Sequence, residues 1–296
     1  MRVLITGAGG QLAAATIDGY AGIAEVRPLS HAELDITDVH AVQHQVSSFK
    51  PDIIINCAAD NRVDQAEQEP IPALNVNALG VRTLARAAAS AGATVVHYST
   101  DFVFDGQTDR PYVEEDPPNP QSIYAASKLL GEWFARDAPR AFVLRVESLF
   151  GGRMTGGSID RIVDAIAEGS ETRAFVDRTV SPSYVMDVAA ATRALLERGE
   201  PGLYHCVGSG YCTWHELALE IARQLQCAAR IVPISVNDLR LPARRPQFAA
   251  LSNAKLLRVG IPMPSWQDAL SRHLRARAQL SERPWAAPDG TAHRQS

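Results

Sequence analysis

Short apolar runs alternate with longer segments of helical periodicity in the first half of the chain. Runs rich in β-branched residues predict strands at 3–6, 25–29, 52–56, 94–99 and 141–146. Three consecutive isoleucines within 52–56 indicate burial on both faces, as in a parallel sheet covered by helices. Helical patterns lie between the strands, notably at 73–91, before Gly92, and at 123–136. This alternation predicts an α/β fold with a doubly wound parallel sheet.

The pattern changes after Phe150-Gly151-Gly152. Helical segments at 158–168, 185–197 and 214–224 are separated by loops and by short strands near 203–207 and 230–233. We therefore expect a first domain over 1–150 and a smaller C-terminal lobe over 151–280, from which some elements return to the first sheet. Residues 281–296 are polar and aperiodic, which predicts a disordered tail.

Composition narrows the class of protein. The 296 residues are 46% hydrophobic, and 29 Lys and Arg against 33 Asp and Glu give a net charge of −4. Nucleic-acid binding requires a basic surface, which this balance does not suggest. We also expect no membrane segment, because no apolar run approaches the ~20 residues that span a bilayer. The N-terminus is not typical of a signal peptide, and the four cysteines are too scattered for a disulfide framework or a zinc site. A cytoplasmic protein without a metal is predicted.

A glycine-rich turn follows the first predicted strand directly. The segment reads Thr6-Gly7-Ala8-Gly9-Gly10-Gln11-Leu12-Ala13 and opens a helix. Gly7 permits a tight turn, Gly10 lets the backbone approach a pyrophosphate, and the small Ala13 allows close contact between helix and strand. The helix N-terminus would supply N–H groups for the phosphates. An ordinary βα turn has the same composition, but the position in the first βαβ unit favours an NAD(P) site in a Rossmann-type domain.

The end of the second strand bears on which dinucleotide binds. An NAD-specific site places Asp or Glu there to bind the ribose 2′-hydroxyl. This region reads Arg27-Pro28-Leu29-Ser30-His31 and holds no carboxylate, so Ser30 and its neighbours are predicted to accommodate a 2′-phosphate. We expect NADP(H) as the preferred cofactor and NAD(H) as an accepted one. Asp35 either lies against the adenine or caps the helix that starts near Asp38.

Tyr124 and Lys128 are four residues apart in the helical segment 123–136, so their side chains share one face. A nearby ammonium favours phenolate and would lower the tyrosine pKa toward the pH of carbonyl reduction. Thr100 follows the strand at 94–99, where ligands of open α/β sheets bind, so its hydroxyl is a candidate for binding a carbonyl oxygen. Each feature alone also suits a surface helix or a turn. Their order along the chain, after the glycine turn, is specific.

These motifs resemble the extended short-chain dehydrogenase/reductases and, within them, the dTDP-4-dehydrorhamnose reductase family. The resemblance extends over roughly residues 1–275. Besides the glycine turn, the matching segments are Leu34-Asp35-Ile36-Thr37-Asp38, 51–59, 63–67, Asn75-Val76-Asn77-Ala78-Leu79-Gly80, 97–106, 124–132, Gly202-Leu203-Tyr204-His205 and Arg245-Pro246. The segment Ser99-Thr100-Asp101, followed by an aromatic residue, Val and Phe, is particularly specific to that family.

The resemblance implies NAD(P)H-dependent reduction of a nucleotide-linked 4-keto-6-deoxysugar. Tyr124 would protonate the C4 oxygen, Lys128 would hold the ribose and tune Tyr124, and Thr100 would bind the same oxygen. Asn77 matches the position that helps to hold the lysine through water. The resemblance also implies cofactor contacts. Gln11 and Leu12 would join Gly7 and Gly10 at the pyrophosphate, and Ile36 would join Ser30 and Asp35 on the adenosine side. The nicotinamide half would contact Ala58, Ala59 and Asn61.

Two departures from the family concern the substrate. The end of the fifth strand reads Arg145-Val146-Glu147-Ser148, whereas typical rhamnose-pathway reductases have Arg-Thr-Ser-Trp, with the tryptophan against the sugar. Ser148 takes the place of that tryptophan. Either the sugar differs in its substituents or its pose, or a change elsewhere in the protein compensates and the sugar is the same. The second departure is the segment Asp60-Asn61-Arg62, which differs from the residues usual in the family. Arg62 either binds a substrate phosphate or, as we expect, forms a surface ion pair with Asp64 or Glu67.

Arginines of the second lobe are candidates for a diphosphate site. Arg178 lies in a predicted loop, where its planar fork of donors suits a diphosphate, and Arg244-Arg245 is a second candidate. Surface charges would look the same in sequence. The predicted substrate-binding residues are therefore Thr100, Asp101, Ser148 and Arg178.

Other functions share these motifs. Relatives of the fold serve as cofactor-binding regulatory subunits, as the methionine adenosyltransferase beta subunit does, although intact Tyr124, Lys128 and Thr100 argue against lost catalysis. An epimerase or 4,6-dehydratase is disfavoured, because a dehydratase carries Asp-Glu after the strand-end threonine and this chain has Asp101-Phe102. A reductase of a different sugar nucleotide is a further alternative. The predicted partner is a nucleotide sugar, and a homodimer is left open.

Overall fold

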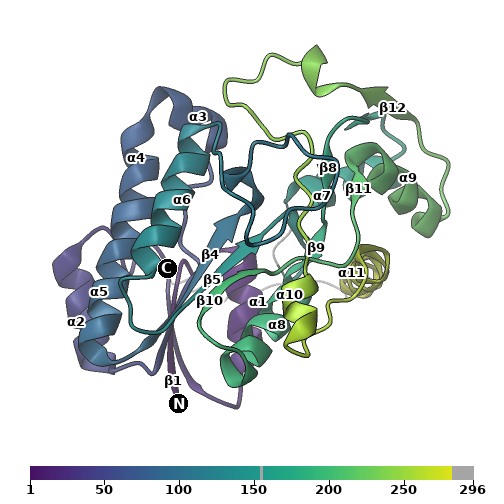
Figure 1. The fold of residues 1–296 in the computed structure, drawn as a ribbon. Helices are drawn as coiled ribbons and strands as arrows, with labels where there is room; N and C mark the ends of the chain where they lie inside the picture. Colours follow the sequence, from purple (N-terminus) through teal and green to yellow (C-terminus); the bar gives the residue numbers. More distant parts are fainter. Residues whose placement is uncertain (154–155, 282–296) are drawn as a thin grey trace, which may run out of the picture.

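A six-stranded parallel sheet forms the centre of the protein (Figure 1). The computed structural model describes residues 1–153 and 156–281, so the predicted disordered tail lies outside it apart from Ser281. The strands of this sheet are β1 (Arg2–Thr6), β2 (Glu25–Leu29), β3 (Ile53–Asn56), β4 (Thr94–Thr100), β5 (Ala141–Val146) and β10 (Gly202–His205). Their spatial order is β10-β5-β4-β3-β1-β2, which confirms the predicted doubly wound sheet.

The apolar character of β3 reflects its place in the middle of the sheet. All four of its residues are buried, and it pairs in parallel with β1 on one side and β4 on the other. The chain leaves β1 for β2 on one side and returns to β3 on the other, so the strand order reverses between β1 and β3. Ligands of open α/β sheets bind in the crevice at such a reversal, and here the glycine turn lies at its edge.

Helices cover both faces of the sheet (Figure 1). One face carries α2 (Val39–Phe49), α5 (Val81–Ala91) and α6 (Ile123–Ala135), and the other carries α1 (Gln11–Tyr20) and α8 (Val185–Arg198). Alternate residues of β1 enter the two cores: Val3 and Ile5 pack on the side of α1 and α8, and Leu4 packs on the side of α2 and α5. The sheet is therefore buried on both sides, as its sequence predicts.

The segment predicted as one helix over 73–91 contains a widened turn. It consists of α4 (Pro70–Leu74), the π-helical η1 (Asn75–Gly80) and α5, and it ends at Gly92 with a φ of 68°. Helix α6 packs tightly on η1 at Gly131, where an added Cβ would lie 2.2 Å from the carbonyl oxygen of Asn77. Because π-turns commonly occur at functional sites, this contact bears on how the site is held.

The second half forms a smaller lobe with its own apolar cluster and sends β10 back to the main sheet, parallel to β5. The predicted strand near 230–233 is β12 (Ile231–Ile234), which pairs with β7 (Thr172–Phe175). The sequence analysis did not predict the helices α10 (Ala254–Arg258) and α11 (Trp266–Ser281). The remaining elements are α3 (Val63–Gln68), η2 (Asp101–Val103), β6 (Leu149–Phe150), α7 (Ser158–Ala167), β8 (Thr179–Val180), β9 (Ser183–Tyr184), β11 (Cys212–Thr213), α9 (Trp214–Leu225) and η3 (Val236–Asp238).

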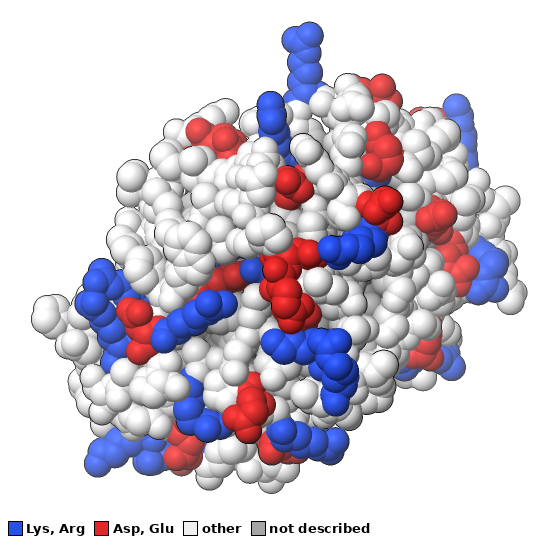
Figure 2. Space-filling view, in the orientation of Figure 1, with Lys and Arg blue, Asp and Glu red and all other residues white. Residues whose placement is uncertain are grey.

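Figure 2 shows acidic and basic side chains intermixed over one face of the molecule, without a continuous basic patch there. None of the helices in the described ranges is long and apolar enough to cross a bilayer. In the same ranges all four cysteines are free, and no cluster of three or more His, Cys, Asp or Glu side chains could hold a metal ion.

Candidate active site

Two adjoining cavities open at the carboxyl ends of β1, β3, β4 and β5, with volumes of about 500 and 520 Å³. They share wall residues that include Gly10, Ala58, Ala59 and Asn61. The first also contains Gln11, Leu12, Thr100, Asp101, Tyr124, Lys128, Ser148 and Arg178, and the second also contains Gly7, Ser30, Asp35 and Ile36. The fold thus brings every predicted site residue except Asn77 into one continuous hollow. A groove of about 1270 Å³ between α2 and α5 contains none of them.

The glycine turn forms a cradle at the boundary of the two cavities. Gly7 has a φ of 67°, and a Cβ there would lie 2.6 Å from the backbone nitrogen of Ala58. Gly10 caps α1 without a side-chain hydrogen bond in the described structure, and its own N–H donates to the carbonyl of Gly7 at 2.9 Å. The N-terminus of α1 lies at this turn, and the dipole of a helix favours an anionic ligand at that end. This backbone, with the paired cavities, fits a dinucleotide.

The end of β2 carries a carboxylate that the local sequence did not reveal. Glu33 folds back so that its Oε2 accepts hydrogen bonds from Ser30 N at 2.8 Å and Ser30 Oγ at 2.7 Å. Residues 27–31 hold no carboxylate, as the sequence analysis stated, but a short turn brings the carboxylate of Glu33, which does not line the cavity, onto Ser30. Arg27 is not part of this cavity: its guanidinium stacks 4.2 Å from the ring of Phe49.

Asp35 lies in the cavity wall as a loop residue. Its Oδ1 accepts hydrogen bonds from the N and Oγ1 of Thr37 at 2.9 and 2.8 Å, and these bonds lower its pKa. The N-cap of α2 is instead Asp38, whose carboxylate accepts from the backbone of His40 and Ala41. Of the two roles considered for Asp35, the structure thus excludes the cap.

Tyr124 and Lys128 project from one face of α6 into the first cavity, and both are buried. The Tyr124 hydroxyl lies 3.4 Å from Asn61 Oδ1, and Lys128 Nζ donates to the carbonyl of Tyr98 at 2.6 Å. Burial, and next the charge of Asp101, raise the pKa of Tyr124 above its ordinary value. The expected lowering by Lys128 is therefore wrong for this arrangement, because the ammonium reaches to β4. Burial lowers the pKa of Lys128 to about 8.

Thr100 and Asp101 close the end of β4 beneath the tyrosine. Thr100 Oγ1 donates to Asp101 Oδ1 at 2.9 Å and accepts from the N–H of Phe102 at 3.2 Å. Phe102 packs edge-on against the Tyr124 ring, with centroids 5.7 Å apart. A substrate carbonyl in this corner would meet the Thr100 hydroxyl and the Tyr124 hydroxyl together.

Asn77 lies behind the cavity wall rather than in it. Its side-chain amide donates to the carbonyl of Asp60 at 2.9 Å and to Ser127 Oγ at 3.0 Å, and its Oδ1 accepts from Asp60 N at 2.8 Å. Asn77 thus ties the loop after β3 to α6, which places Asn61 opposite Tyr124. The resemblance implies that Asn77 holds the lysine through water, and these direct contacts add a positioning role for the loop.

The far wall of the first cavity comes from the β5 end and the second lobe. Ser148 has a φ of 42°, so the chain turns sharply directly after Glu147. Arg178 stacks its guanidinium 5.6 Å from the Phe102 ring, and Trp214 reaches the same cavity from the start of α9. The sequence analysis did not select Glu147 or Trp214 as site residues. A charged residue at the end of an apolar strand was the available signal for Glu147.

The ion pairs expected for Arg62 have different partners. Arg62 pairs with Asp60 at 2.6 Å, not with Asp64 or Glu67. Asp64 instead holds Arg245 through two hydrogen bonds of 2.9 and 2.7 Å. Arg245 reaches the first cavity from a segment about 180 positions later in the chain, and no local pattern could have shown that pairing.

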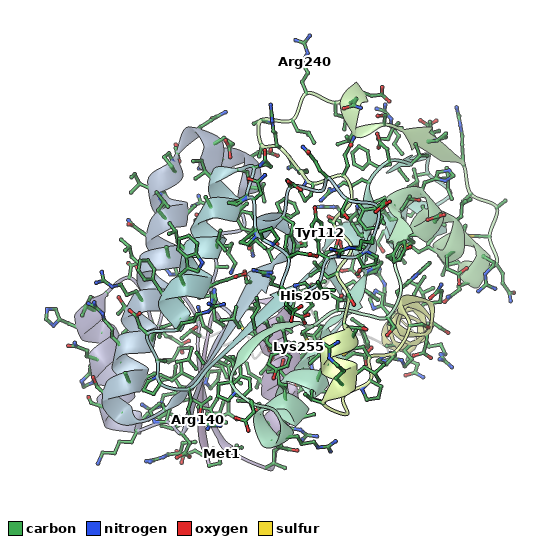
Figure 3. The ribbon with its side chains drawn as sticks, in the orientation of Figure 1. Met1, Tyr112, Arg140, His205, Arg240 and Lys255 are labelled. Carbon is green, nitrogen blue, oxygen red and sulfur yellow. The ribbon has the colours of Figure 1, made fainter. Side chains whose placement is uncertain are left out.

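A buried ion pair supports this end of the sheet from behind. Both carboxylate oxygens of Glu132 accept from Arg145 at 2.8 Å, and Glu132 Oε1 also accepts from Ser99 Oγ at 2.6 Å. His205, on the outer strand β10, extends this network: its ring lies 3.4 Å from Arg145 Nη1 and 3.1 Å from the carbonyl of Tyr112 (Figure 3 labels His205 and Tyr112). The network fixes α6 against β4 and β5, and so it orients Tyr124 and Lys128.

Comparisons with known proteins agree with this geometry. The family model of the RmlD substrate binding domain matches residues 1–279. The chain belongs to this family. The RmlD-family chain is 33% identical to the spore coat polysaccharide biosynthesis protein SpsK of Bacillus subtilis, over 95% of this chain and 99% of that one. It is 36% identical to the dTDP-4-dehydrorhamnose reductase of Mycobacterium tuberculosis H37Rv, over 94% and 93% of the two chains.

Solved structures extend the likeness. The dTDP-4-dehydrorhamnose reductase of Bacillus anthracis, in complex with NADP, superposes with a TM-score of 0.89 at 33% identity, over 93% of this chain and 99% of that one. The Clostridium acetobutylicum protein gives a TM-score of 0.89 at 32% identity, over 94% and 100%. A UDP-glucose 4-epimerase of Thermus thermophilus, at 23% identity, shares the fold alone.

Proposed function

We propose that this RmlD-family protein reduces a nucleotide-linked 4-keto-6-deoxysugar with NADPH, accepts NADH less well, and uses Tyr124 as the proton donor. The observation that carries the proposal is the shared cavity: Tyr124, Lys128 and Thr100 line the hollow that continues into the glycine turn of β1 and α1. The reductases among its relatives, one of them in complex with NADP, support the same chemistry.

The residues of the two cavities suit the halves of the cofactor. Gly7 and Gly10, with Gln11 and Leu12, would hold the pyrophosphate at the start of α1. The loop from Ser30 to Ile36 would hold the adenosine, and Ala58, Ala59 and Asn61 would hold the nicotinamide half. Bound NAD(P)H supplies the hydride.

The raised pKa of Tyr124 keeps its phenol protonated at neutral pH, and this is the state that a proton donor needs. The hydroxyl can give that proton to the carbonyl oxygen as negative charge develops there, while Thr100 binds the same oxygen. Lys128, cationic below about pH 8, lines the same cavity and would hold the nicotinamide ribose. Asp101, Ser148 and Arg178 would contact the sugar nucleotide, with residues 151–280 selecting the substrate.

The test follows NADPH oxidation with dTDP-4-keto-6-deoxyglucose as substrate. Replacing Tyr124 with Phe removes only the hydroxyl, so kcat should fall by about 10²–10⁴ while the Kd for NADPH changes less than about twofold. Tyr211→Phe is the matched control, because Tyr211 is exposed and lies outside both cavities. Normal turnover by Tyr124→Phe would rule out the proton-donor role. NADPH binding without turnover of keto-sugar nucleotides would favour a regulatory subunit.

A further inference from the structure

One wall of the first cavity contains unusually many buried polar atoms without a hydrogen-bond partner. Six side-chain atoms in the described ranges are buried and unpartnered, and four of them belong to residues of this cavity. They are Asp101 Oδ2, Glu147 Oε1, Arg178 Nε and Trp214 Nε1. Buried polar groups are normally paired, so a group of orphans in one cavity wall indicates where a ligand makes its hydrogen bonds.

The two carboxylates of this wall are held by one oxygen each. Glu147 Oε2 accepts from the backbone N–H of Ser181 at 2.7 Å, and Asp101 Oδ1 accepts from Thr100 Oγ1 at 2.9 Å. Glu147 and Asp101 are only 2% and 4% exposed, so neither side chain can swing out to find water. Each therefore keeps one acceptor oxygen fixed and unused within the cavity wall.

The unpartnered oxygens of Glu147 and Asp101 favour a ligand that donates hydrogen bonds to them. Burial, and then the charge of Asp101, raise the pKa of Glu147, whereas Arg178 opposes this shift with its positive charge. A hydroxyl that donates to these carboxylates would relieve part of that cost, and its own oxygen could accept from Arg178 or Trp214. A methylene in the same place would leave the carboxylates unpaired.

The position of the wall indicates which ring carbon carries that hydroxyl. Asp101 directly follows Thr100, whose hydroxyl lies in the corner where the substrate carbonyl would meet Tyr124. A substituent that reaches Asp101 and Glu147 therefore belongs to a carbon next to the reacting C4. C5 carries the ring oxygen, so the hydroxyl-bearing neighbour is C3.

We propose, building on the proposed function, that Glu147 determines specificity by accepting a hydrogen bond, together with Asp101, from a hydroxyl at C3 of the keto sugar. The substrate class is thus a 4-keto-6-deoxyhexose nucleotide that retains its 3-hydroxyl, and 3-deoxy sugars are rejected. Glu147 is then a substrate-binding residue at the end of β5, in addition to those that the sequence indicated.

The experiment compares wild type, Glu147→Gln and Glu114→Gln with the dTDP-linked 4-keto-6-deoxyhexose and its 3-deoxy analogue. Glutamine retains an oxygen for Ser181 but places an NH₂ group toward the cavity. Glu114 is a matched control, since it also accepts one backbone N–H at 2.7 Å, from His205, and lies outside the cavity. We expect wild type and Glu114→Gln to prefer the hydroxylated substrate at least tenfold in kcat/KM. In Glu147→Gln the preference should fall below about threefold, chiefly through loss on the hydroxylated substrate.

Equal losses on both substrates would overturn the inference, because they would mean that Glu147 only positions Ser181. An unchanged preference would overturn it as well. Calorimetric binding of the reduced 6-deoxyhexose nucleotide and its 3-deoxy counterpart separates this inference from the proposed function, because binding needs no turnover. If wild type binds the hydroxylated nucleotide more tightly than its 3-deoxy counterpart and Glu147→Gln does not, the inference is supported. This holds even if wild type reduces neither keto sugar, in which case only the proposed function fails. Binding without discrimination by wild type refutes it.

Discussion

Replacing Lys128 with Met should make the protein more stable and inactive. Lys128 is 3% exposed, and burial lowers its pKa from 10.5 to about 8. This shift of 2.5 corresponds to about 3 kcal/mol by which the folded state disfavours the ammonium at neutral pH. Methionine has a similar length and carries no charge, but it loses the hydrogen bond to the Tyr98 carbonyl, which is worth about 1 kcal/mol. The net expected gain is about 2 kcal/mol at pH 7.

The gain should depend on pH in a defined direction. A lysine with a lowered folded-state pKa destabilises the fold fully below that pKa, and the effect is lost as the pH rises from about 8 to 10.5. The gain of Lys128→Met over wild type should therefore be largest below pH 8 and should be lost before pH 10.5, where the missing hydrogen bond leaves the variant slightly less stable. Buried tyrosines and cysteines titrate in the same range, but they are identical in both proteins and cancel in the difference.

Urea unfolding of both proteins at a series of pH values measures this difference, and NADPH oxidation measures the loss of activity. Lys50→Met is the control, because Lys50 is exposed and its replacement should change little at any pH. The reasoning is refuted if Lys128→Met is less stable than wild type at pH 7. It is also refuted if the gap at pH 10.5 equals the gap at pH 7.

Three further changes test the rest of the site. Glu33→Ala should raise the ratio of kcat/KM for NADPH to kcat/KM for NADH severalfold, because the carboxylate near the adenosine loop repels a 2′-phosphate. An unchanged ratio would place Glu33 away from the cofactor. Glu132→Gln leaves Arg145 buried without its counter-charge and should cost about 3–5 kcal/mol in urea unfolding, whereas Glu220→Gln, in a pair with an exposed arginine, should cost under about 1 kcal/mol. Gly7→Ala should weaken NADPH binding in a fluorescence titration far more than Gly9→Ala. A Cβ at Gly7 would clash with the backbone of Ala58, whereas a Cβ at Gly9 meets nothing within 4 Å. Equal effects would contradict the close approach of Gly7 to Ala58.

The strands and the order of the motifs were readable from sequence because their signals are local. The apolar runs predict β1 to β5 to within one residue at either end, and in the inner strands burial on both faces leaves a continuous apolar pattern. The widened turn at 75–80 was not readable in the same way. Its residues suit a helix, and its extra width accompanies the contact with α6 at Gly131, which is distant in sequence.

By itself, the sequence determined the fold class, the family and the residues that meet at the carboxyl ends of the strands, because these depend on residue types at fixed short spacings. The tertiary structure alone decided how those residues are paired and charged. It placed Glu33 on Ser30, turned Lys128 toward β4, and gave Arg245 to Asp64. It also buried Glu147 beside Asp101 with an unused oxygen. Hydrogen bonding and desolvation depend on which groups share a low-dielectric cavity, and segments far apart in the chain decide that.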